Sequence, residues 1–430
     1  MIDISFERYA LDNGLRVVLA RDPDVPVVAV NLWYNVGSRN ERAGRTGFAH
    51  LFEHMMFQGS AHVPEMAHFA LIEKAGGSLN GSTSLDRTNY FETLPAHELE
   101  LALWLESDRL GWLVPAMTQA KLDNQRAVVK NERRWRVDNQ PYGDWDERLQ
   151  GMLYPEDHPY HHSVIGSMED LDAATLEDVE QFFRTYYAPN NAVLTICGAF
   201  DTDIARSMVA RYFGEIPAGP SIPLLPGRTE LPRILGREAR AVVTQDVSLA
   251  RIYLAYRVPP YGDEAFYPAL VASTLLATGK ASQLYRTLVR ERRLAQDVFA
   301  GVFPIVVGAS MLVLWITAKP NVDVSELERV LFEEIEALRN ARDADVERAV
   351  NLLETETLIG LQRVDERADL LSMYTTLFDD PGRIRSELER VRAVTPERVR
   401  SFAESFLGEE NRGVVHYLPR ERTEELGLRR

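Results

Sequence analysis

The sequence predicts an α+β protein built from two similar halves. Its 430 residues are enough for two or three domains. Strand-like and helix-like segments are interleaved along the whole chain. The segments that begin at Thr175 and Thr395 both predict a helix with an N-terminal Thr cap, a short turn containing Asn, and a strand. They lie 220 residues apart, and we interpret this repetition as an internal duplication.

The first half begins with strands and turns. Asn13-Gly14 is a strong tight-turn dipeptide between strand-like residues, and VPVVAVNLWYNVGS then predicts a long, mostly buried strand. Helical patterns follow at about 47–58, 65–75, 96–112 and 118–138. Between them, SLNGSTSLDRTNYFETLP predicts a strand, a turn and a second strand.

A proline-rich segment separates the two halves. Residues 216–238 contain five prolines, which exclude a regular helix or a central strand. We therefore predict an N-terminal domain at 1–215, a linker at 216–238 and a homologous C-terminal domain at 239–430.

Composition excludes several functional classes. Acidic residues outnumber basic ones by 64 to 48, for a net charge of −16, so nucleic acid is not the expected partner. No run of about 18 apolar residues predicts a membrane-spanning helix. The N-terminus shows no signal peptide, and the single cysteine, Cys197, excludes an internal disulfide. We expect a cytoplasmic protein, although a signal removed earlier is an alternative, and we expect Cys197 to lie in a buried strand.

Three titratable residues share one apolar helix, in TGFAHLFEHMMFQGS. On a helix, residues i, i+3 and i+4 lie on one face, so His50 and His54 can direct two imidazoles at one ion. Glu53 lies beside them, where it can hold a metal-bound water and accept its proton. H-x-x-E-H is the inverted zinc-protease motif, which predicts Zn²⁺ as the cofactor. Two core histidines and an ion-paired glutamate are the structural alternative.

Such a site needs a third ligand, and two candidates stand out. The cluster DHPYHH at 157–162 holds three histidines, but its Pro and Tyr favour a solvated surface loop. Glu132 lies on the helix predicted at 118–138, where the alternative is a solvated glutamate paired with Arg133 or Arg136.

Several stretches together resemble the M16 (pitrilysin-like) metallopeptidases, especially short bacterial members and processing-peptidase β-type subunits. They are YNVGSRNE, GFAHLFEHMMFQGS, GGSLNGSTSLDRTNYFETLP, VVKNERR, VIGSMEDL and YYAPNNAVLTICG. The resemblance implies two α/β-sandwich-type domains, each with a mostly antiparallel sheet flanked by helices. It implies that 1–215 is the catalytic domain, that His50, His54 and Glu132 bind zinc, and that Glu53 is the general base. The second domain would lack the zinc motif.

The resemblance also assigns a substrate strand. GGSLNGST resembles the exposed edge strand to which a peptide substrate adds, which implies substrate contacts for Ser78, Leu79, Asn80 and Gly81. Asn80 would lie near the scissile bond; its alternative role is to close an Asn80-Gly81 turn. Gln125 occupies a position that is often acidic in the family.

The family's other site pair is incomplete here. The family places an Arg and a Tyr seven residues apart to stabilise the oxyanion. In TLVRERRLAQDVFAG, Arg290 matches the arginine, but the matching tyrosine position holds Asp297 or, with a one-residue gap, Gln296. A carboxylate would repel the oxyanion, while Gln296 can donate only a weak hydrogen bond.

We therefore predict a zinc endopeptidase subunit that cleaves peptides or small unfolded polypeptides. A related subunit with the Arg/Tyr pair would complete a heterodimer shaped like a closed clamshell. The alternatives are a self-sufficient homodimer and a non-catalytic structural subunit of the same family.

Overall fold

The computed structural model describes residues 4–420, which form two compact units. Unit 1 contains residues 4–133, 162–226 and 358–387, and unit 2 contains residues 134–161, 227–357 and 388–420. Each unit has its own sheet and its own hydrophobic core. No helix or strand lies between Phe213 and Ala239, the region of the predicted linker.

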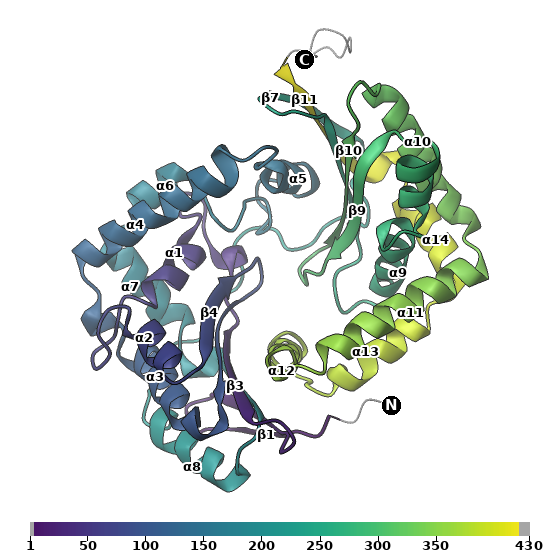
Figure 1. Cartoon of the computed structure of the whole chain (residues 1–430). Coiled ribbons are helices and arrows are strands. Elements are labelled where there is room, and N and C mark those ends of the chain that lie inside the picture. Colours follow the sequence, from purple (N-terminus) through teal and green to yellow (C-terminus); the bar gives the residue numbers. More distant parts are fainter. Residues whose placement is uncertain (1–3, 421–430) are drawn as a thin grey trace. The chain divides into compact units, whose positions relative to one another are not determined.

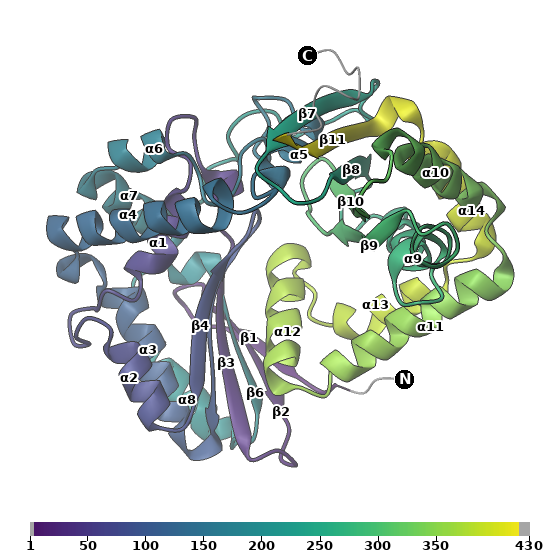
Figure 2. The same ribbon diagram turned by 45° about the horizontal axis from the view of Figure 1, so that its top comes forward.

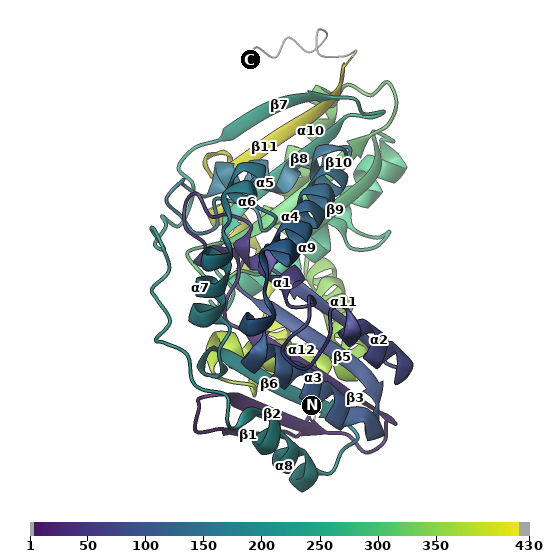
Figure 3. The same ribbon diagram turned by 90° about the vertical axis from the view of Figure 1, so that its left-hand side faces the viewer.

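The sheet of unit 1 has the strand order β1-β2-β6-β3-β5-β4. Its strands are β1 (Glu7–Ala10), β2 (Arg16–Arg21), β6 (Ala192–Gly198), β3 (Val27–Tyr34), β5 (Thr88–Pro95) and β4 (Ser78–Thr83). Only β2 and β6 pair in parallel. Figure 3 shows β1, β2 and β6 side by side, with α8 (Thr202–Phe213) nearby. At the opposite edge, β4 pairs only with β5 among the strands of residues 4–420, so its other edge has no strand partner there.

Helices lie on both faces of this sheet (Figure 2). On one side are α1 (Phe48–Met55), α2 (Ala67–Lys74), α3 (Leu99–Trp112), α4 (Gln119–Arg133), α6 (Met168–Ala173) and α7 (Leu176–Tyr186). The other face carries α12 (Val364–Phe378). Asp369 of α12 accepts hydrogen bonds from the Trp33 indole (2.8 Å) and the Asn89 amide (3.0 Å), which tie the helix to β3 and β5.

The five-stranded sheet of unit 2, in the order β7-β11-β8-β10-β9, repeats the scheme from β2 to β4 and has no strand that corresponds to β1. Its strands are β7 (Ala239–Gln245), β11 (Arg412–Pro419), β8 (Arg251–Val258), β10 (Ser310–Ala318) and β9 (Ala295–Phe303). Here β7 and β11 form the parallel pair, and β9 is the edge strand that corresponds to β4. Both sheets are thus mostly antiparallel with one parallel pair, as an internal duplication predicts.

The helices of unit 2 also lie on both faces (Figure 1). One side carries α9 (Phe266–Ala277), α10 (Val324–Glu336) and α14 (Pro396–Phe406). The chain also forms α11 (Asp343–Gly360) and α13 (Arg383–Arg392), each divided between the units. The other face carries α5 (Trp145–Leu153), whose Trp145 ring stacks on Tyr253 of β8 at 5.2 Å.

The structure confirms the predicted fold class: two similar units, each a sheet flanked by helices. Helix α5 comes from the first half of the sequence but is part of unit 2. Helix α12 comes from the second half but is part of unit 1. The domain limits 1–215, 216–238 and 239–430 stay a prediction.

Candidate metal centre

The first site element is α1, whose sequence FAHLFEHM buries Phe48, Leu51, Phe52 and Met55 in the core. The same spacing that buries these side chains leaves His50, Glu53 and His54 partly exposed on the opposite face. Gly47 caps the helix at φ 84°, a left-handed conformation that favours glycine, and a Cβ there would meet the Ile165 carbonyl oxygen at 2.6 Å.

The second site element is α4, which contacts α1. Leu122, Gln125 and Val129 form its buried stripe, and Glu132 continues that stripe by three residues. The helix then passes into a π-helical segment at Arg134–Asp138. Glu132 is therefore held in the last turn of α4 on the side that faces the histidines.

Three side chains meet between these helices. Glu132 Oε2 lies 3.6 Å from His50 Nε2 and 3.3 Å from His54 Nε2. The ligand atoms of all three lie within 4.8 Å of one another, and no other group of three or more histidine, cysteine or acidic residues in 4–420 is so arranged. DHPYHH forms no such group.

This donor set fits zinc. Two ligand atoms that each lie about 2.0–2.2 Å from a tetrahedral zinc are roughly 3.4 Å apart. The distances from Glu132 Oε2 to the Nε2 atoms of His50 and His54, 3.6 and 3.3 Å, are close to this value. Two imidazoles and one carboxylate are also a ligand set that zinc accepts with a coordination position left open. The side chains of His50, His54 and Glu132 are 13%, 23% and 15% exposed, so they are shielded but still reachable.

Glu53 extends from the same helix towards β4. The Thr83 hydroxyl donates a hydrogen bond to Glu53 Oε2 at 2.6 Å. Burial raises the pKa of Glu53 above its ordinary value, and the Thr83 hydrogen bond and the charge of His54 oppose this rise. The arrangement keeps a carboxylate beside the three possible ligands.

A buried glutamate, Glu41, and the partly exposed His162 support the start of α1. Glu41 accepts hydrogen bonds from the backbone N–H groups of Gly47 (2.8 Å) and Ala49 (2.7 Å), which are otherwise unsatisfied at a helix N-terminus. His162 Nε2 lies 2.9 Å from Glu41 Oε2. Burial lowers the pKa of His162, but the hydrogen bond and charge of Glu41 outweigh that effect and raise it.

Sequence reasoning missed the roles of Glu41, His162 and Thr83. The link between His162 and Glu41 joins residues 121 positions apart, and no local pattern signals it. The position of Thr83 could have been predicted from the sequence. Strand residues two apart share a face, and Gly81 was already a candidate substrate contact.

The predicted substrate residues lie on β4. The alternative role of Asn80, which was to close an Asn80-Gly81 turn, is wrong. Asn80 and Gly81 pair with Phe91 and Tyr90 inside the ladder, so they do not close a turn; the chain turns at 84–87 instead. The cross-strand partners on β5 outweigh the local preference of Asn-Gly for a turn. Ser78 and Asn80 are exposed on this edge strand, while Gly81 is buried.

The segment DHPYHH is not a solvated loop, which corrects a second expectation. His158 and Tyr160 are 2% and 0% exposed, and His158 stacks on Tyr154 at 4.9 Å. Aromatic packing therefore overrides the loop character that Pro and Tyr suggested.

The predicted oxyanion region belongs to unit 2. Arg290 is exposed at the end of a π-helical segment, Tyr285–Glu291. Gln296 is exposed at a β-bulge of β9, where the register with β10 shifts. Asp297 accepts a hydrogen bond from the Thr317 hydroxyl at 3.0 Å. No tyrosine occupies β9, in agreement with the sequence.

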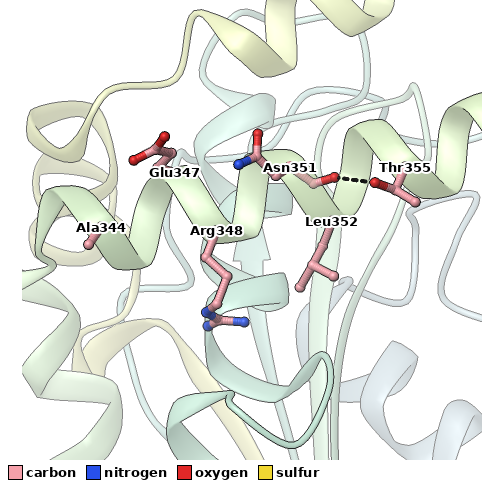
Figure 4. A pocket seen from close by; sticks show the side chains of 6 residues that line it. All are labelled: Ala344, Glu347, Arg348, Asn351, Leu352 and Thr355. Carbon is pink, nitrogen blue, oxygen red and sulfur yellow. Dashed lines mark hydrogen bonds between the residues drawn. The ribbon is translucent and has the colours of Figure 1, made fainter.

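A separate groove runs along α11 and carries no comparable chemistry. Figure 4 shows its lining residues on one helix, with the Thr355 hydroxyl donating to the Asn351 carbonyl at 2.7 Å. The lining has one carboxylate, Glu347, and neither histidine nor cysteine. The catalytic candidates therefore stay with α1, α4 and β4.

The H-x-x-E-H pattern on α1, with the Glu132 carboxylate of α4 beside it, is the arrangement of an inverted zinc-protease motif with a third possible ligand. The profile of the insulinase (peptidase family M16) domain matches residues 16–154, and that of the peptidase M16 inactive domain matches residues 173–353. The chain belongs to peptidase family M16.

Proteins of similar sequence include a zinc protease and a processing-peptidase subunit. The chain is 28% identical to the zinc protease PqqE of Helicobacter pylori over 87% of this chain and 82% of that protein. It is 25% identical to the mitochondrial-processing peptidase subunit beta of Blastocladiella emersonii over 94% and 87% of the two chains.

Among solved structures, a protease from Helicobacter pylori matches with a TM-score of 0.91 and 27% identity. That match covers 97% of this chain and 100% of the other. Within residues 4–420, none of the helices has the length and apolar character needed to span a membrane.

Proposed function

We propose that the chain is the zinc-bearing subunit of an endopeptidase that cleaves peptides or small unfolded polypeptides. The observation that carries this proposal is the convergence of His50, His54 and Glu132 to within 4.8 Å, with Glu53 on the same helix as the two histidines. The names of its relatives, zinc protease and processing peptidase subunit, agree with this class.

In this proposal His50, His54 and Glu132 hold the zinc. When bound, zinc supplies a Lewis acid that polarises the substrate carbonyl and lowers the pKa of a coordinated water. Glu53 accepts a proton from the attacking water as the new C–O bond forms. Glu53 then returns the proton to the amide nitrogen as the C–N bond breaks, so that a carboxylic acid and an amine leave.

The proposed substrate position is the open edge of β4. An extended peptide can add to this edge by backbone hydrogen bonds, which hold the chain without demanding particular side chains. Ser78, Leu79, Asn80 and Gly81 are the proposed contacts, and the exposure of Ser78 and Asn80 supports this role. Gly81 also brings the strand close to Glu53: a Cβ at Gly81 would lie 3.2 Å from Glu53 Cγ.

We further propose that a related subunit completes the site. Oxyanion stabilisation needs hydrogen-bond donors, and each is worth several kcal/mol in comparable enzymes. Here Arg290 has no tyrosine partner on β9, and the Asp297 carboxylate would repel a developing oxyanion. A subunit of the same family with an Arg/Tyr pair would supply the missing donors.

The substitution Glu53→Gln tests the general base. A glutamine cannot accept the proton, so peptide hydrolysis should fall by at least about 100-fold while zinc content and circular dichroism stay unchanged. The measurement is fluorogenic peptide turnover, paired with zinc analysis of the same samples. Turnover within a few-fold of the unsubstituted protein would refute the role of Glu53.

A further inference from the structure

We propose that Thr83 is a positioning residue that fixes the orientation of the Glu53 carboxylate. This inference rests on the proposed function, in which Glu53 is the general base. Thr83 is the last residue of β4, and its hydroxyl is 2.6 Å from Glu53 Oε2, a distance typical of a charge-assisted hydrogen bond. No other hydrogen bond holds the Glu53 carboxylate within residues 4–420.

The hydroxyl of Thr83 is well placed to act as a fixed donor. Thr83 pairs with Thr88 across the ladder, which fixes its backbone, and a β-branched side chain has few χ1 choices. Thr88 donates its own hydroxyl proton to the Val36 carbonyl at 3.0 Å, and the two hydroxyl oxygens are 3.4 Å apart. The Thr83 proton is therefore directed to Glu53.

The hydrogen bond from Thr83 to one carboxylate oxygen of Glu53 leaves the other oxygen available for catalysis. Because Oε2 accepts from Thr83, Oε1 is the oxygen left to accept a proton from water. Without the Thr83 hydroxyl, the carboxylate can rotate about its terminal torsion, which has a broad energy profile. Misplacement of a reacting group by about 1 Å can cost on the order of 100-fold in rate.

The hydrogen bond also connects the base to the substrate strand. Leu79, Gly81 and Thr83 share one face of β4, since strand residues alternate, and this is the face against α1. The strand that we propose as the peptide acceptor therefore also orients the base. A peptide that stiffens β4 would stiffen the Thr83 donor as well.

The substitution Thr83→Val removes the hydroxyl and keeps the β-branched shape. We expect kcat for a fluorogenic peptide to fall by roughly 10- to 100-fold with KM and zinc content unchanged, because the hydroxyl orients the base but binds neither substrate nor metal. Thr83→Ser retains the donor and should restore most of kcat. The assay uses the zinc-loaded chain co-expressed with a homologue that carries the Arg/Tyr pair.

The matched control is Thr93→Val on the adjacent strand β5. The Thr93 hydroxyl makes no hydrogen bond within residues 4–420, so this substitution should leave kcat within about twofold of the unsubstituted protein. If Thr83→Val also stayed within twofold, or if Thr83→Ser failed to restore turnover, a positioning role for Thr83 would be wrong.

A crystallographic comparison separates this inference from the proposed function, because it needs no activity. The unsubstituted chain should show Glu53 in one conformer bonded to Thr83, and Thr83→Val should show the carboxylate turned or in several conformers. A Glu53 that is unchanged in Thr83→Val would overturn the inference even if the enzyme is active. If the zinc-loaded complex hydrolyses no peptide, the proposed function fails, while this comparison still decides what orients Glu53.

Discussion

At the scale of single residues, Glu132 brings a third possible metal ligand to the pair of histidines. His50 and His54 follow from the helical spacing alone, since one turn of α1 brings both to the same face. Glu132 lies on another helix, yet its carboxylate oxygen is 3.3 Å from His54 Nε2. In the proposed site, the negative charge of Glu132 would offset part of the charge of a bound metal, which two neutral imidazoles cannot do.

We expect Glu132→Gln to weaken zinc binding by more than about 100-fold, since loss of a ligand should exceed the 10- to 100-fold cost of losing an outer partner. Competition with a chromophoric chelator measures the affinity. The matched control is Asp123→Asn, the same chemical change on α4 at an exposed carboxylate that bonds Gln119 and Arg126. Equal affinities for the two variants would contradict the assignment of Glu132.

The residues of the site differ in how far sequence alone could predict them. The histidines and Glu53 are readable because a helix makes neighbours of residues three and four apart. Glu132, 78 positions beyond His54, became a firm candidate only through the family resemblance. The Glu41–His162 pair was not predicted at all, because its two residues meet only through tertiary packing.

At the scale of helices and strands, short sequence patterns predicted the structure correctly where residues close in sequence determine it. The Thr175 and Thr395 hydroxyls each accept a hydrogen bond from the backbone N–H three residues on, as the cap pattern predicted. Cys197 lies buried in β6, also as predicted. Such patterns failed where contacts with other segments determine the structure. Asn80 and Gly81 pair with β5 in the sheet, and aromatic packing buries part of DHPYHH.

The cap prediction can be tested on α7. Thr175→Ala should lower the free energy of unfolding by about 1 kcal/mol, because it leaves the backbone N–H of Asp178 without its acceptor. Thr185→Ala is the control on the same helix. Within residues 4–420 the Thr185 hydroxyl bonds only the Gln181 carbonyl, so this change should be neutral or slightly stabilising. Guanidinium unfolding followed by circular dichroism compares the two. Equal losses would argue against the cap.

At the scale of the whole molecule, duplication of the sheet was predictable but the assignment of helices to the units was not. The repeat of 220 residues is visible as a cap, a turn and a strand, and both sheets keep the same strand scheme. The placement of α12 in unit 1 depends on contacts such as Asp369 with Trp33, which are 336 residues apart. Long-range contacts of this kind leave no periodic signature in the sequence.

The duplication also bears on why this chain would carry only part of the proposed peptidase site. The second sheet keeps the edge strand β9, but its counterpart of α1, helix α9, has no histidine or acidic residue, and β9 has no tyrosine. We therefore propose that the chain supplies the zinc, the general base and the substrate strand. The oxyanion donors would come from a related subunit.

Fluorogenic peptide hydrolysis by the zinc-loaded chain, alone and co-expressed with an Arg/Tyr-bearing homologue, tests whether the site is divided between two subunits. We predict little turnover by the chain alone and an increase of at least about 100-fold with the homologue, the scale on which one oxyanion donor acts. Full turnover by the lone chain would contradict the divided site. Absence of turnover in both samples, with zinc bound, would contradict a peptidase function.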